Sequence, residues 1–282
     1  MFIFAIIITS FLEQKMLLVN LRQRFQMQVN WYIEYFIKRN FKTASQIRYT
    51  YFIALVPIII ILLLLKFILS FNLAFVIIYK LINLLLFILT INVLTWKQIA
   101  KTTNSQNDYH FITHYATHFF AALFWYLILP SAIGSISYMM IMSMSAKLKN
   151  KGLDIIVYDL VVDKLLFYIN VVPYLILFIF IAMAGDFETS IHHLITKFRS
   201  FTPSFYFLDK TLKEMTLISI GKDKFKLDID ENTKYEIYYN ETSDLTNEHF
   251  TPEIKSYIIA ILYRTSIFYI GLLIILKFAS ML

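Results

Sequence analysis

Three histidines recur at intervals of four residues and form the most suggestive chemical pattern in the chain. His110, His114 and His118 would share one face of a helix, and neutral imidazoles spaced in this way suit a transition metal. The only nearby fourth ligand is Asp108, and the chain has no HExxH signature. A polar helix face at a membrane boundary explains the same row. We therefore predict no metal and no cofactor, and keep the three histidines only as alternative metal candidates.

Carboxylates form a second candidate group. Asp154, Asp159 and Asp163 could hold Mg²⁺, which binds proteins through one or two carboxylates together with substrate phosphates. A solvated helix face is the simpler interpretation of this spacing. The adjacent pair His192 and His193 would point apart on a helix. The chain has no cysteine, no phosphate-binding loop of the GxxxxGK[ST] or GxGxxG type, and no GxSxG nucleophile elbow.

Three cations lie inside apolar runs, where charged residues are functional candidates by default. Lys66 and Lys80 are close to Phe71-Asn72, the tip of a predicted helical hairpin, so both could extend to the membrane surface. Arg264 is nearer the middle of its run and is the better candidate for a buried ion pair, with Glu13 as a possible partner.

The elements that must position these residues follow from the composition. Of 282 residues, 59% are hydrophobic and only 16% are charged, which is more apolar surface than a soluble domain of this size can bury. The net charge of +7 is explained by Lys and Arg in cytoplasmic loops, as in other membrane proteins, and not by nucleic-acid binding. The composition therefore predicts an integral membrane protein whose main partner is the lipid bilayer.

About five long apolar segments and a short N-terminal one, residues 1–12, predict an all-α polytopic fold, because spanning a bilayer takes about 20 apolar residues. The long segments are residues 51–70, 73–96, 115–146, 165–185 and 256–276. We expect one membrane domain over residues 1–282, with residues 186–255 as a polar extramembrane lobe before the last helix. Within this lobe, residues 224–230 and 235–239 predict a β-hairpin.

The topology is ambiguous around Pro130 and Gly134. Residues 13–50 contain seven basic and two acidic residues, so we predict that this loop is cytoplasmic. Lysines then place residues 97–114 and 147–164 on the same inner side, although a single helix over residues 115–146 would separate them. Either two half-helices enter and leave the membrane with a break at Pro130, or one long kinked helix crosses it and residues 147–164 lie outside.

Three short stretches resemble the AmpE and CobD/CbiB family of membrane proteins. They are the Leu123-Phe124-Trp125 stretch followed by Pro130, Gly134 and Tyr138, then Asn170-Val171-Val172-Pro173, and then Gly185-Asp186-Phe187. The family has a synthase branch, which forms an amide bond in cobalamin biosynthesis at the expense of ATP. Its AmpE branch is an inner-membrane protein associated with β-lactamase induction and peptidoglycan recycling.

The resemblance favours the AmpE branch, because the charged groups of the synthase motifs are replaced here. Thr113-His114 and Thr117-His118 stand where the synthase carries its first acidic motif. Ser143-Met144-Ser145 replaces its Thr-Leu-Asp, Leu166-Phe167 replaces an Asp pair, and Leu175 replaces an Arg. Uncharged residues cannot hold Mg-nucleotide or neutralise phosphate. We therefore predict no amide ligation, and leave open whether another activity is retained.

The resulting hypothesis is a multi-pass protein of the bacterial inner membrane with a regulatory or sensory role. A cobalamin-type synthase and a transporter of small molecules or lipids are the alternatives. The motifs are expected to build one polar pocket for a small-molecule or peptidoglycan-derived ligand, and membrane proteins are possible further partners. The pocket residues that we predict are His114, His118, Trp125, Tyr138, Asn170 and Asp186.

Overall fold

The computed structural model describes residues 19–37, 43–69, 73–91, 110–129, 132–150, 159–199, 201–220 and 252–279. All regular secondary structure in these ranges is helical, which confirms the predicted all-α class. Four helices there are long and apolar enough to cross a membrane: Ala44–Ile68, His110–Ile128, Val161–Ala184 and Ile254–Ile275. The predicted N-terminal apolar segment, its Glu13, and the predicted β-hairpin lie outside the described residues.

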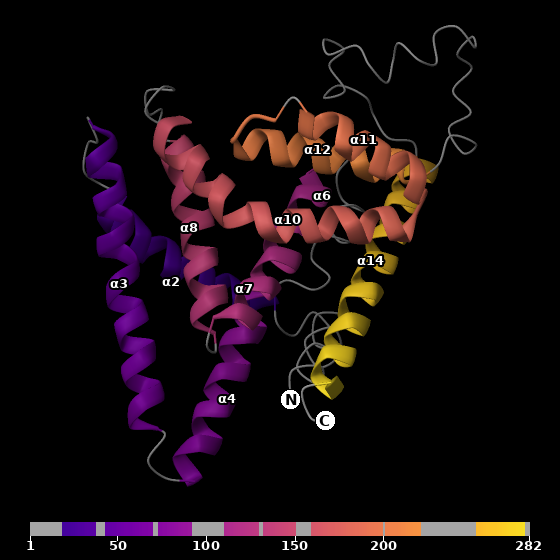
Figure 1. Ribbon diagram of the computed structural model, residues 1–282. Helices are drawn as coiled ribbons and strands as arrows, with labels where there is room; N and C mark the ends of the chain where they lie inside the picture. The colour runs from indigo at the N-terminus through magenta and orange to yellow at the C-terminus, as the bar shows by residue number, and fades with distance from the viewer. Residues whose placement is uncertain are drawn as a thin grey trace, which may run out of the picture. The chain divides into compact units, whose positions relative to one another are not determined.

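The chain divides into two compact units. The first comprises residues 1–95, 116–174 and 202–208, and the second comprises residues 96–115, 175–201 and 209–282. Three helical stretches therefore belong partly to one unit and partly to the other. Figure 1 shows the helices with their labels.

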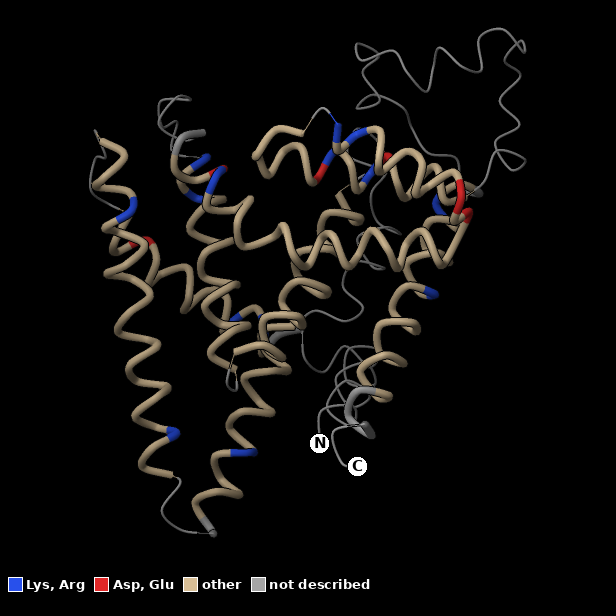
Figure 2. Tube along the Cα trace, viewed as in Figure 1, with Lys and Arg blue, Asp and Glu red and all other residues tan. Residues whose placement is uncertain are grey.

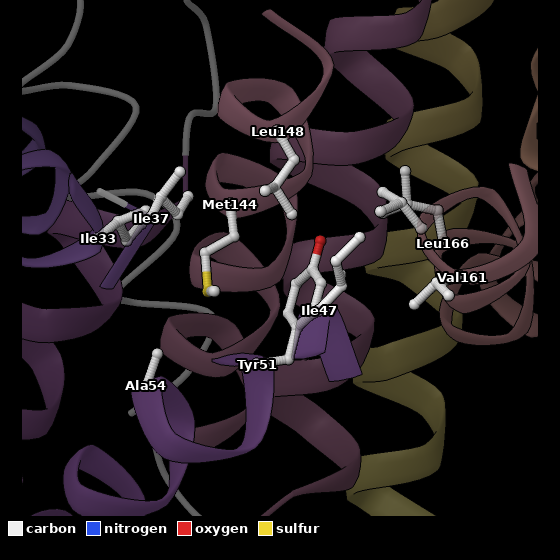
Figure 3. Packing of buried hydrophobic residues seen from close by; sticks show 10 residues of the cluster. Ile33, Ile37, Ile47, Tyr51, Ala54, Met144, Leu148, Val161 and Leu166 are labelled. Carbon is white, nitrogen blue, oxygen red and sulfur yellow. The ribbon is translucent and has the colours of Figure 1, made fainter. Parts of the chain in front are cut away.

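The first unit has an apolar core where α2 (Val19–Ile37), α3 (Ala44–Ile68) and α8 (Ile133–Asn150) meet. In Figure 3, Met144 of α8 lies between the isoleucines of α2 and Tyr51 of α3. The α3 residues that are buried, Ile47, Tyr51 and Ala54, recur at helical spacing, which explains why α3 begins seven residues before the apolar run. Val161 and Leu166 complete this core.

Part of the basic segment that the sequence suggested to be a loop is the helix α2. Its Arg22 is buried and donates to the carbonyl oxygens of Ile88 (2.7 Å) and Ile91 (2.9 Å). These carbonyls lie at the end of α4 (Leu73–Thr90), where the last turn of a helix leaves acceptors without intrahelical donors. Arg22 therefore caps α4, in addition to any part it plays in the charge balance of the loop.

The helices α3 and α4 form the predicted hairpin, and they approach each other toward residues 69–72 (Figure 1). Near the base, the end of α4 from Phe87 to Thr90 and the following Ile91 are buried. Between residues 55 and 68, and again between 75 and 86, no side chain is fully buried. The hairpin thus has a packed base and two apolar arms, which suits helices that are surrounded by lipid.

The long apolar run around Pro130 is two helices and not one. The first runs from His110 to Ile128 as α6 (His110–His114), a π-helical segment (Tyr115–Ala121) and α7 (Ala122–Ile128). Leu129 is extended, and α8 begins at Ile133. The interpretation as one continuous kinked helix is therefore wrong, because the chain leaves helical geometry before Pro130 and turns back on itself.

In the second unit, the later part of α10 (Lys164–Ala184) is followed by α11 (Phe187–Arg199), α12 (Phe205–Ile218) and α14 (Pro252–Ala279). Within the predicted polar lobe, α11 and α12 are thus two amphipathic helices. Arg264 of α14 donates to the carbonyl oxygen of Ala184 at 3.4 Å. The Ala184 carbonyl lies at the C-terminal end of α10, where cations are favourable. This contact accounts for an arginine within an apolar run.

Candidate functional site

Two residues of the predicted pocket, Tyr138 and Asn170, meet in the interior of the first unit. The Tyr138 hydroxyl donates to Oδ1 of Asn170 at 2.7 Å, and Nδ2 of Asn170 donates to the carbonyl oxygen of Leu166 at 2.8 Å. Asn170 is fully buried and Tyr138 is 3% exposed. Because unsatisfied polar groups are costly in an apolar interior, this pair couples α8 to α10 and makes the two side chains depend on each other.

Trp125, another residue of the predicted pocket in this unit, donates to a backbone carbonyl of α10 that a proline leaves without its helical donor. Pro173 has no backbone N–H, so the carbonyl of Ile169, four residues earlier, lacks its helical donor. The Nε1–H of Trp125 donates to this carbonyl at 3.0 Å. The tryptophan motif on α7 and the Asn-x-x-Pro motif on α10 are therefore two parts of one interaction.

At the break between α7 and α8, a side chain of the α3–α4 hairpin accepts a hydrogen bond from a free backbone N–H. The backbone N–H of Ala132 donates to Oδ1 of Asn83 on α4 at 2.7 Å. Asn83 also lines a small pocket with Leu62 of α3 and Ile133 of α8. Broken helices persist at membrane depth only where protein or water satisfies the backbone, and Asn83 meets part of that requirement.

Gly134 explains how closely the two helices approach after the break. A Cβ atom placed on Gly134 would lie 2.0 Å from the carbonyl oxygen of Trp125 and 3.0 Å from Cβ of Leu129. A side chain at this position would therefore force α8 away from α7. Contact between positions 125 and 134, on opposite sides of the break, also establishes that the two helices form a hairpin.

All three histidines of the row lie within the described residues. No group of three or more His, Asp or Glu side chains that could hold a metal is present in the ranges that the structure describes. The rings of His110 and His114 have centroids 6.5 Å apart, and the segment that follows is π-helical. The structure thus does not bring the three histidines together as one group of ligands, and the expected absence of a metal stays a prediction.

The acidic row also has a structural contact. Both carboxylate oxygens of Asp163 accept from the backbone N–H of Phe205 at 3.1 Å. Phe205 is the first residue of α12, where free N–H groups attract anions, and Ser204 caps the same end through the N–H of Phe207. Asp154 lies outside the described residues.

In the second unit, Asp186 is the N-cap of α11. Its carboxylate accepts from the Thr189 N–H at 3.2 Å and from the Thr189 hydroxyl at 2.8 Å, while its own N–H donates to Ser219 at 2.9 Å. A Cβ atom on Gly185 would lie 2.1 Å from that Ser219 carbonyl oxygen. The Gly-Asp-Phe motif thus makes a tight turn between two helices, and its aspartate is used in capping.

Charged groups of the second unit gather along α12. Glu214 lies 3.1 Å from Nε2 of His193 and 3.2 Å from Nζ of Lys197, both on α11. Burial of Glu214 opposes ionisation, but the His193 hydrogen bond and the Lys197 charge outweigh it and lower the pKa of the carboxyl. One turn earlier on α12, Asp209 pairs with Lys213 at 2.6 Å and accepts from Thr113 of α6 at 2.7 Å.

Comparison of the chain with family profiles, with curated proteins and with solved structures finds no match. The resemblance to the AmpE and CobD/CbiB family therefore stays a prediction that rests on the three sequence motifs.

Of the six predicted pocket residues, Tyr138 and Asn170 bond to each other, and Trp125 bonds to the backbone carbonyl of Ile169, which precedes Asn170 in the chain. His118 is a half-buried residue of the same unit, whereas His114 and Asp186 belong to the second unit. A single pocket joining all six stays a prediction. Sequence reasoning missed the π-helical segments 115–121 and 159–163, which coincide with or directly precede the motif positions. It also missed Asn83, although an amide within an apolar helix signals a buried partner.

Proposed function

We propose that this chain is an AmpE-like protein of the bacterial inner membrane that acts in signalling associated with β-lactamase induction and peptidoglycan recycling, without a catalytic centre of its own. The observation that carries the proposal is the use of the motif side chains. Trp125, Tyr138, Asn170 and Asp186 each bond to a neighbouring helix or to the start of their own helix. They build the fold and leave few polar groups to act on a substrate.

The positions that correspond to charged synthase residues support this proposal over amide ligation. Leu166 and Phe167 are each 4% exposed and contribute to the apolar interior. Ser145 is buried and shares a 2.8 Å hydrogen bond with the Tyr51 hydroxyl. A ligase needs carboxylates for Mg²⁺ and cations for phosphate at its reacting centre. Buried leucine, phenylalanine and serine supply neither, so the proposed protein transmits or binds a signal and performs no ligation.

The helix break supports the same choice over transport. In transporters, broken helices present free backbone groups to a substrate near the membrane midplane. Here the N–H of Ala132 is already bonded to Asn83, and Gly134 is packed against Trp125. The break therefore brings two helices into contact, as expected for a fixed structural element. The ligand that the proposal favours is a peptidoglycan-derived molecule or a membrane-protein partner.

The test is expression of the chain in a bacterial strain that has an inducible β-lactamase and lacks its own AmpE. β-Lactamase activity is measured with and without an inducing β-lactam. We expect the chain to alter the induced level, and Gly271→Ala, a position with no neighbour within 4 Å, to behave like the wild type. An unchanged level at equal amounts of membrane-inserted protein would contradict the regulatory role.

A parallel experiment separates the enzyme alternative. The same chain is expressed in a strain that lacks the cobalamin synthase and depends on cobalamin for growth. We expect no growth, because the positions of the acidic motif are apolar or neutral here. Restored growth would overturn the proposal and show that ligation survives on a different set of residues.

A further inference from the structure

The far ends of the α3–α4 hairpin, residues 63–68 of α3 and 75–81 of α4, are called the distal arms. Their large apolar side chains are strongly exposed, including Leu64 (53%), Phe67 (62%) and Ile77 (55%). The surface they present is too apolar for water, so lipid must surround it. Each distal arm carries one cation within this apolar surface, Lys66 and Lys80, and both lysines are exposed.

The two lysines have no acidic neighbour to neutralise them. Residues 35–107 contain no Asp and no Glu, so no counter-ion can come from the hairpin or from the chain on either side of it. Figure 2 shows blue and no red on the arms of α3 and α4. Among the described residues, neither lysine takes part in an ion pair. Because an unpaired charge is costly in hydrocarbon, an anionic partner from outside the described part of the chain would be favourable at these lysines.

Helix geometry brings the two ammonium groups toward one depth. Lys66 lies two residues before the end of α3, about 3 Å from it, and Lys80 lies seven residues after the start of α4, about 10 Å from it. Side chains in a helix lean toward its N-terminus. Lys66 therefore leans away from the tip and Lys80 leans toward it. The four-residue connection 69–72 keeps the two helix ends close together, so both cations can reach a single anionic group.

We propose that Lys66 and Lys80 form a binding site for the phosphate of an anionic phospholipid such as phosphatidylglycerol. The occupant is a lipid and not a free anion, because the lysines are surrounded by exposed leucine, isoleucine and phenylalanine side chains that match acyl chains. The site lies at the end of the hairpin opposite its packed base. It is independent of the proposed regulatory role and of the motif residues.

The test uses the full-length protein in lipid nanodiscs that contain phosphatidylcholine with or without phosphatidylglycerol. After extraction into mild detergent, native mass spectrometry measures how much of each lipid remains bound. We expect the wild type to retain phosphatidylglycerol in preference to phosphatidylcholine. Each change, Lys66→Gln or Lys80→Gln, should weaken that preference roughly fivefold, the effect expected for one lysine at an anionic surface.

Controls separate a specific site from net charge and from misfolding. The pair Lys66→Arg and Lys80→Arg keeps both charges and should retain the lipid. The pair Lys149→Gln and Lys210→Gln removes the same charge from α8 and α12 and should also retain it. Equal lipid retention in the Lys66→Gln/Lys80→Gln protein and the wild type would overturn the proposal. So would displacement of the lipid by an equal concentration of inorganic phosphate, or a loss of binding in the arginine pair.

Discussion

Two regions of the first unit differ in what stabilises them. The motif core, formed by Trp125, Tyr138 and Asn170 with their neighbours on α7, α8 and α10, is buried and joined by hydrogen bonds between helices. The distal arms of the hairpin expose apolar side chains and have few contacts with the rest of the unit. The same classes of residue, leucine and isoleucine, thus serve as packed core in one region and as lipid-facing surface in the other.

The difference shows which interactions of a membrane protein depend on one particular partner. Lipid tails are as apolar as leucine, so the arms gain little by exchanging lipid for protein contact. In the motif core, by contrast, each polar group has one partner, and the loss of that partner leaves an unsatisfied group in an apolar interior. We therefore expect substitutions in the core to have large effects that depend on the partner. Those in the arms should have small effects unless they introduce polarity.

Among these substitutions, Gly134→Ala should lower the free energy of unfolding the most. The new Cβ would meet the backbone of Trp125 at 2.0 Å, and a backbone cannot rotate away as a flexible side chain can. We expect the free energy of unfolding in detergent to fall by about 3 kcal/mol or more. Thermal unfolding followed by circular dichroism measures this loss.

The matched control is Gly271→Ala on α14, where an added Cβ meets nothing within 4 Å. This helix should become more stable by about 0.5–1 kcal/mol, since alanine favours helices over glycine. Equal effects of the two substitutions would mean that the close approach of α7 and α8 does not exist.

Asn170→Leu should be next in size. The leucine fills a similar volume but leaves the Tyr138 hydroxyl without its acceptor in a fully buried position. We expect a loss of about 2–3 kcal/mol in the free energy of unfolding. Tyr138→Phe in the same protein removes the stranded hydroxyl and should restore part of the stability. If the double variant is as unstable as the sum of the two single variants, the two side chains do not depend on each other.

Trp125→Phe tests the hydrogen bond that replaces the helical bond missing at Pro173 in α10. It removes the donor to the Ile169 carbonyl, at a half-buried position, and should cost about 1–2 kcal/mol. Pro173→Ala supplies the missing helical N–H to the same carbonyl. In a Pro173→Ala background, Trp125→Phe should therefore cost much less, and a double-mutant cycle by thermal unfolding measures the coupling. An undiminished cost would locate the role of Trp125 in packing alone.

These features differ in how far the sequence could predict them. The apolar runs predicted α3, α4, α10 and α14, because length and hydropathy are local properties of the chain. Pro130 and Gly134 indicated a break or a kink for the same reason, and left the choice between the two open. Pro173 also indicated an unpaired carbonyl at Ile169, but nothing local specifies that Trp125, 44 residues away, donates to it. Partner choice depends on tertiary packing.

The errors have the same origin. The basic residues of segment 13–50 predict a loop because a sequence shows charge and not burial, whereas Arg22 is buried and caps α4. The helices α11 and α12 differ from the predicted polar lobe, because the β-prone residues 224–230 and 235–239 give its sequence a strand-like pattern that its earlier residues do not share.

The smallest effect should come from shortening one exposed side chain on a distal arm. Leu64 is 53% exposed, whereas Leu148 of α8 is fully buried in the core with Met144 and Ile37. Leu148→Ala leaves a cavity and should cost about 2–5 kcal/mol. Leu64→Ala should change the free energy of unfolding by less than about 0.5 kcal/mol, as for other exposed sites, because its side chain contacts lipid or detergent in the folded and unfolded states alike. Thermal unfolding of both variants in the same detergent checks the pair. A cost at Leu64 close to that at Leu148 would mean that the distal arms are covered by protein, for example by a second copy of the chain, and would remove the distinction between the two regions.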